Sequence, residues 1–208
     1  MIGFYNYTVI LTYIGVAVSM LGMNFACREQ FEYSIVCLAI ACVCDAFDGK
    51  VARTKKNRTA EMELFGVQID SLCDLICFGI SPVVLSYQIG MCRGVGIIVG
   101  IFFVLCGVIR LAYYNVLEEM KRTGEKQKEE KKIYHGLPIT TIGVIYPLVF
   151  LLYPHLSLKV FIRVIMGMHV VVGTLYITDF KITRPKDGVI ACCVVMMVVV
   201  LMKILHVF

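Results

Sequence analysis

Four aspartates lie at helix-compatible spacings in a chain that is otherwise strongly apolar. Asp45 and Asp48 are three residues apart, and Asp70 and Asp74 are four residues apart. Residues three or four apart share one face of an α-helix, so each pair places two carboxylates side by side. A carboxylate at the centre of a membrane helix costs about 2.5–3.5 kcal/mol on insertion scales, so four of them need a compensating charge. One or two divalent cations can supply it, and a cation held at a membrane surface suggests chemistry on a phosphorylated lipid.

The type of ligand indicates the type of metal. Hard carboxylate oxygens favour Mg²⁺ or Mn²⁺, whereas the thiols that flank the aspartates (Cys42, Cys44, Cys73 and Cys77) would select a softer metal. We interpret most of the ten cysteines as small apolar packing residues. A cation transporter built on the same carboxylates is the alternative to phosphoryl chemistry.

Small residues and one arginine accompany the aspartates. Gly49 and Ala52 lie on the same helical stripe as the first pair, and Gly66 lies one turn before Asp70. Such positions either let helices approach closely or leave room for a flat ligand. Arg53 follows Gly49 by one turn, and it can either pair with a carboxylate or hold a phosphate through two hydrogen bonds.

The elements that must position these residues are membrane helices. The chain has 208 residues, 59% of them hydrophobic, and a mean hydropathy of +0.83, which excludes an ordinary soluble domain. The chain contains several apolar runs of about 18 or more residues, the length of a transmembrane helix. These runs predict an all-α polytopic membrane bundle that forms a single domain over residues 1–208. We expect about seven transmembrane helices, within a range of six to eight, near residues 7–26, 32–52, 64–89, 94–115, 137–153, 157–178 and 188–207.

The basic residues predict the orientation of this bundle. The net charge is +5, and Lys and Arg cluster in residues 53–58, 121–132 and 181–186, after the second, fourth and sixth predicted helices. These stretches therefore share one side of the membrane, which the positive-inside rule makes cytoplasmic. Both aspartate pairs adjoin the first stretch, so we expect the site to face the cytoplasm. A basic face beside a bilayer indicates contact with anionic membrane lipids rather than with nucleic acid.

The combined pattern resembles a known signature. Asp-x-x-Asp-Gly-x-x-Ala-Arg at residues 45–53, followed by Gly-x-x-x-Asp-x-x-x-Asp at residues 66–74, is similar to the signature of the CDP-alcohol phosphatidyltransferase family. The defining residues are all present, although the spacer between Arg53 and Gly66 is longer than the family usually has. The resemblance implies a homodimer with a core of six membrane helices, in which an alcohol displaces CMP from a CDP-activated substrate.

The resemblance also implies a role for each residue of the signature. The metal ligands would be Asp45, Asp48, Asp70 and, in part, Asp74, which would also be the catalytic general base. Gly49 and Ala52 would leave space for the cytidine, Arg53 would contact the diphosphate, and Gly66 would belong to the same substrate-binding site.

Further residues narrow the resemblance to the phosphatidylserine synthases of bacteria and archaea. Residues 65–82, FGVQIDSLCDLICFGISP, are similar to a block of that group, and Ser71 within it would contact substrate. Arg110 and Asn115 match a downstream segment, in which Tyr113 stands where an Arg is common. Arg110 would bind phosphate or the serine carboxylate, or pair structurally at a helix end.

This closer resemblance implies a reaction and a location. The enzyme would transfer the phosphatidyl group from CDP-diacylglycerol to L-serine and release CMP, in a prokaryotic cell membrane. Glycerol 3-phosphate and an inositol phosphate are the alternative acceptors, and both would demand extra basic residues near the site.

Overall fold

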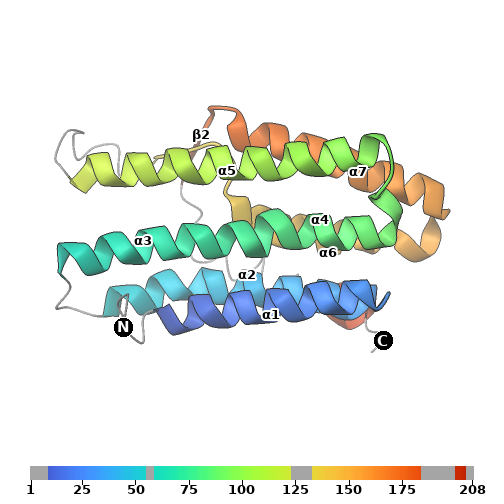
Figure 1. Cartoon of the computed structure of the whole chain (residues 1–208), viewed down its shortest axis with the longest axis horizontal. Helices are drawn as coiled ribbons and strands as arrows, with labels where there is room; N and C mark the ends of the chain where they lie inside the picture. Colours follow the sequence, from blue (N-terminus) through green and yellow to red (C-terminus); the bar gives the residue numbers. More distant parts are fainter. Residues whose placement is uncertain (1–8, 55–58, 123–132, 184–199, 205–208) are drawn as a thin grey trace.

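The computed structural model describes residues 9–54, 59–122, 133–183 and 200–204, with side chains described except at 49–54, 121–122, 133–135 and 181–183. Its helices lie roughly parallel to one another (Figure 1). The pair α1 (Ile10–Cys27) and α2 (Phe31–Thr54) forms one side, and the pair α5 (Val95–Arg122) and α7 (Leu158–Ile177) forms the other. Between them lie α3 (Ala60–Asp74) and α4 (Ser81–Ser86), while α6 (Ile142–Phe150) packs against α2 and α7. The prediction of an all-α polytopic bundle is confirmed.

Several of the helices are membrane spans by length and composition. Within the described residues, four helices are long and apolar enough to cross a membrane: Ile10–Cys27, Ala60–Met91, Val95–Met120 and Leu158–Ile177. The apolar helix Ile139–His155 is shorter, and α2 has 24 residues but carries charged residues near its end. Most of the last predicted span, 188–207, lies outside the described residues. The chain is an integral membrane protein.

A stripe of small residues explains why α1 packs closely on α2. The residues Thr12, Gly15, Ser19, Gly22 and Ala26 recur every three or four positions and form the buried face of α1. A Cβ added at Gly22 would lie only 2.8 Å from the Cβ of Cys37 on α2, so this contact requires a glycine. Small residues allow such close approach between membrane helices. The contact aligns the first turn of α1 with the last turns of α2.

The span that follows begins with a capped helix and contains two wider turns. The Thr59 hydroxyl accepts a hydrogen bond from the backbone N–H of Met62 at 3.2 Å, which fixes the start of α3. A π-helical turn, η2 (Leu75–Ile80), follows α3 directly, and a second one, η3 (Tyr87–Met91), follows α4. Turns of this kind are often found at functional sites.

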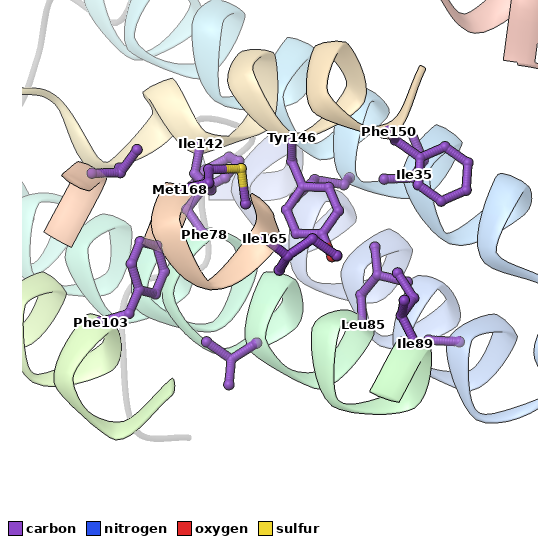
Figure 2. Packing of buried hydrophobic residues seen from close by; sticks show 14 of the residues in the cluster. Ile35, Phe78, Leu85, Ile89, Phe103, Ile142, Tyr146, Phe150, Ile165 and Met168 are labelled. Atoms are coloured by element: carbon purple, nitrogen blue, oxygen red, sulfur yellow. The ribbon is translucent and has the colours of Figure 1, made fainter. Parts of the chain in front are cut away.

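The apolar core lies between the helices. Figure 2 shows buried side chains from several helices meeting around Tyr146, which is 0% exposed. Its hydroxyl lies 2.8 Å from that of Ser86 on α4, so the polar group is satisfied inside the bundle. Two short 3₁₀ turns, η5 (Ile139–Thr141) and η6 (Tyr153–His155), flank α6.

A small β-ribbon joins two polar connections, and the sequence pattern did not predict it. Strand β1 (Ile133–His135) pairs antiparallel with β2 (Lys181–Thr183). The chain then turns at Gly136, which has φ +73°, and the N–H of Gly136 donates to the carbonyl of Phe180 at 2.8 Å. A Cβ at this position would lie 3.1 Å from the carbonyl oxygen of Thr178, so glycine is the residue that fits here.

Candidate functional site

Helix α2 contributes Asp45 and Asp48 near its end. Asp45 is half-buried and Asp48 is buried, with 7% of its surface exposed. The hydroxyl of Thr12, on α1, donates a hydrogen bond to Oδ2 of Asp48 at 3.0 Å. The sequence reasoning did not identify Thr12, although it lies on the small-residue stripe that holds α1 against α2.

Helix α3 contributes Asp70 and Asp74, one helical turn apart and both half-buried. The carboxyl groups of Asp45 and Asp74 lie close to one another across the two helices, as do those of Asp48 and Asp70. Ionised carboxylates this close repel one another, so a cation between them would stabilise the arrangement. The two aspartate pairs therefore converge in one small volume, as their helical spacing predicted.

This volume fits a divalent cation. Asp45, Asp70 and Asp74 each offer one carboxylate oxygen, and these oxygens lie within 4.8 Å of one another. Oxygen ligands lie at about 2.1 Å from Mg²⁺ and at about 2.4 Å from Ca²⁺, so opposite ligands around an ion are roughly 4–5 Å apart. The donors in this group are all hard oxygens, and no thiol of the described residues belongs to it. The donor set suits Mg²⁺ or Mn²⁺ better than a soft metal.

The remaining residues of the signature lie between Asp48 and Asp70 in the sequence. The backbone of Gly49, Ala52 and Arg53 continues α2 to Thr54, and their side chains lie outside the described part of the structure. At Gly66 on α3, an added Cβ would meet no atom of the described residues within 4 Å. The observation favours room for a ligand at Gly66 over close helix packing, the two interpretations that the sequence left open.

The Ser71 hydroxyl forms a hydrogen bond with another helix. This hydroxyl donates to Oδ1 of Asn115 on α5 at 2.6 Å, and Nδ2 of Asn115 donates to Oε1 of Gln68 at 3.2 Å. These bonds fasten α3 to α5 beside Asp70. The structure thus gives the Ser71 hydroxyl a contact between helices, and its predicted contact with substrate stays a prediction.

Arg110 lies on the same helix as Asn115 and is buried, with 6% of its surface exposed. Its Nε donates to the carbonyl of Leu137 at 3.1 Å, and its guanidinium carbon lies 5.7 Å from the ring centroid of Tyr114. That distance is within the range of a cation–π contact, about 6 Å. These two contacts fix the guanidinium at the wall of a pocket.

The pocket has a volume of about 220 Å³ and lies between α5 and the end of α7. Its lining combines two charged residues, two tyrosines and three others: Arg110, Asp179, Tyr113, Tyr176, Ile109, Ile177 and Thr178. The hydroxyl of Tyr176 donates to the carbonyl of Ile139 at 2.8 Å. Helix α5, which carries Arg110, is joined to the aspartate-bearing helix α3 by the hydrogen bond between Ser71 and Asn115. Sequence reasoning missed Tyr176 and Asp179, because no motif marks them.

Comparison with known proteins agrees with this site. The sequence model of the CDP-alcohol phosphatidyltransferase family matches residues 5–177, which include all four aspartates and Arg110. The chain belongs to the CDP-alcohol phosphatidyltransferase family.

The names of its curated relatives describe enzymes that act on serine or make a serine lipid. The chain is 38% identical over 98 residues to the CDP-diacylglycerol–serine O-phosphatidyltransferase of Saccharomyces cerevisiae, a match that covers 47% of this chain and 33% of the yeast protein. It is 35% identical over 134 residues to the archaetidylserine synthase of Methanothermobacter thermautotrophicus, covering 64% and 49%. It is 29% identical over 150 residues to the CDP-diacylglycerol–serine O-phosphatidyltransferase of Helicobacter pylori, covering 71% and 58%. The chain thus spans only part of the length of these relatives.

Proposed function

We propose that the protein transfers the phosphatidyl group of CDP-diacylglycerol to L-serine, forming phosphatidylserine and CMP. The observation that carries the proposal is the convergence of carboxylate oxygens from Asp45, Asp70 and Asp74 within 4.8 Å, on two adjacent helices. Family membership supports group transfer over the alternative of cation transport. The names of the yeast and Helicobacter relatives, which specify CDP-diacylglycerol and serine, support these two substrates.

The aspartates would hold the metal that this reaction needs. A divalent cation, Mg²⁺ or Mn²⁺, bound by Asp45, Asp48, Asp70 and Asp74 would neutralise the diphosphate and the charge that develops as CMP departs. The Thr12 hydroxyl restrains the Asp48 carboxylate from the neighbouring helix. The proposal assigns the space beside Gly66 to part of the nucleotide. It assigns Gly49, Ala52 and Arg53, at the end of α2, to the cytidine and the diphosphate, as the family resemblance implies.

Asp74 is the general base in the proposed mechanism. It accepts the proton of the serine hydroxyl while the serine oxygen forms a bond to the lipid-side phosphorus. The bond from that phosphorus to the bridging oxygen breaks, and CMP leaves with the electron pair. A base must lie within hydrogen-bonding reach of the proton it removes. Asp74 lies on α3, which the Ser71–Asn115 hydrogen bond joins to α5, the helix that lines the pocket. Most of the remaining rate enhancement comes from holding the two substrates in line.

The bilayer sets the surroundings of the reaction. The acyl chains of the substrate stay among membrane lipids, which explains why the carboxylates lie on helices of the membrane bundle rather than in a soluble domain. The proposal places the site on the cytoplasmic side, because Lys and Arg cluster in the connections next to it. It also includes a homodimer, as the family resemblance implies.

Measurement of CMP release tests the proposal. The purified full chain is incubated in mixed micelles with CDP-diacylglycerol, Mg²⁺ or Mn²⁺, and radiolabelled L-serine, and both CMP and labelled lipid are quantified. We expect the two products in equal amounts, dependent on the metal. CMP release without labelled lipid would show hydrolysis by water in place of transfer to serine, and cation flux in proteoliposomes without CMP release would show a transporter.

A further inference from the structure

The pocket beside Arg110 has two electrical poles. Arg110 supplies the positive pole, buried and held in place by the Leu137 carbonyl. Asp179 supplies the negative pole, two residues after the end of α7. The end of an α-helix carries a partial negative charge from its unpaired carbonyls, so α7 adds to the negative pole.

The size of the pocket limits what can occupy it. Its volume is about 220 Å³, below the roughly 300–1,000 Å³ of pockets that enclose drug-sized ligands. A small polar molecule fits this space, and a nucleotide with two acyl chains does not. The pocket is therefore suited to the smaller of the two substrates.

We infer that Arg110 and Asp179 together select a zwitterionic hydroxy amino acid as the acceptor, an inference that rests on the proposed function. The carboxylate of the acceptor pairs with Arg110, and its ammonium group pairs with Asp179. The hydroxyl then points toward Asp74 on α3, the helix that the Ser71–Asn115 hydrogen bond joins to α5 beside Arg110. Asp179 is a specificity-determining residue in this arrangement.

The same two charges disfavour the other acceptors of this chemistry. A phosphate-bearing acceptor brings two negative charges to a pocket in which Asp179 repels them. A neutral polyol leaves both Arg110 and Asp179 without an ionic partner from the ligand. Specificity arises from such unfavourable pairings as well as from the favourable ones.

A series of acceptors tests the roles of Arg110 and Asp179 separately. The wild-type full chain is assayed for CMP release with L-serine, 3-hydroxypropanoate, which lacks the ammonium group, ethanolamine, which lacks the carboxylate, and glycerol 3-phosphate. We expect L-serine to have the highest kcat/KM. In Asp179→Asn, kcat/KM for L-serine should fall at least about tenfold, as for the loss of a hydrogen bond to a charged group. The value for 3-hydroxypropanoate should not fall, because that acceptor has no ammonium group to lose its partner.

A matched control and the contrary outcomes complete the test. Glu29→Gln removes the same charge at the turn between α1 and α2 and should leave every acceptor unaffected. If Asp179→Asn lowers kcat/KM equally for L-serine and 3-hydroxypropanoate, Asp179 acts only by supporting the fold or Arg110, and the inference fails. Unchanged serine kinetics also overturn it. A wild-type preference for glycerol 3-phosphate overturns the inference alone, whereas no CMP release with any acceptor overturns the proposed function itself.

Discussion

The hydrogen bond from Thr12 to Asp48 tests whether Asp48 belongs to the metal centre. Thr12 Oγ1 lies 3.0 Å from Asp48 Oδ2, and both residues are buried. A hydrogen bond to a charged group contributes about 1.5–3 kcal/mol, which corresponds to roughly 10- to 100-fold in an equilibrium constant. Thr12→Val keeps the size of the side chain and removes the donor. We therefore expect it to weaken Mn²⁺ binding by about 10- to 100-fold, the usual cost of losing a group that orients a metal ligand.

Binding can be measured without turnover, because free Mn²⁺ gives an electron paramagnetic resonance signal that protein-bound Mn²⁺ largely loses. Titration of purified protein then yields the Kd of each variant. Thr12→Ser retains the hydroxyl and should restore wild-type affinity. Ser19→Ala removes a buried hydroxyl from the same stripe of α1, about 10 Å along the helix axis from Thr12. This control should bind Mn²⁺ as the wild type does.

Two results would refute this reasoning. Wild-type Mn²⁺ affinity in Thr12→Val would show that the metal does not depend on the orientation of Asp48. Equal weakening in Thr12→Ser and Thr12→Val would show that packing around the methyl group, and not the hydrogen bond, aligns α1 with the site.

Four further predictions concern the proposed mechanism and the helix contacts beside it. Asp74→Asn should lower turnover by about 100- to 10,000-fold while labelled CDP-diacylglycerol still binds, and wild-type incorporation of serine into lipid would remove Asp74 from the mechanism. EDTA should abolish CMP release and added Mg²⁺ or Mn²⁺ should restore it, so activity that survives exhaustive chelation contradicts a metal centre. Gly66→Leu should raise KM for CDP-diacylglycerol at an unchanged Tm, because an added Cβ meets no atom within 4 Å in the part of the chain that the structure describes, and a lowered Tm would indicate a packing role instead. Asn115→Leu should lower stability by about 1–3 kcal/mol, because it leaves the Ser71 hydroxyl without its acceptor. A raised KM for serine at unchanged stability would instead place Ser71 in the substrate site.

The convergence of the aspartates could be predicted because it depends on local geometry. The α-helical period places Asp45 beside Asp48 and Asp70 beside Asp74, and consecutive antiparallel spans bring both pairs to one depth. The hydropathy of the chain predicted the spans themselves. Neither inference needs knowledge of which helix faces which.

Contacts between distant segments could not be predicted in this way. The small residues of α1 predict close packing against some helix, but not that the partner is α2 or that Thr12 would reach Asp48. Asp179 follows a helix end and belongs to no motif, and strand β2, which begins two residues after it, is only three residues long. A pattern of polar and apolar residues predicts which face is buried, whereas the three-dimensional packing decides which side chains share a pocket.

The π-helical turn η2 explains how a single span presents carboxylates in its first part and apolar core residues in its second. In a regular α-helix Phe78, four residues after Asp74, would lie on the same face as Asp70 and Asp74. A π turn bonds each residue to the fifth one along, so it rotates the following residues relative to that face. Phe78 is 1% exposed, and its ring lies against Gly143 of α6, where an added Cβ would be 3.4 Å from Cε1.

The sequence around η2 makes the wider turn inexpensive. Pro82 has no N–H to donate to the carbonyl four residues earlier, so a regular helix would lack that bond in any case. Gly79 leaves room for Leu75, whose Cδ1 would lie 2.8 Å from an added Cβ. The charged face of the span therefore ends at Asp74, and the apolar face that follows can pack in the core without bringing a carboxylate with it.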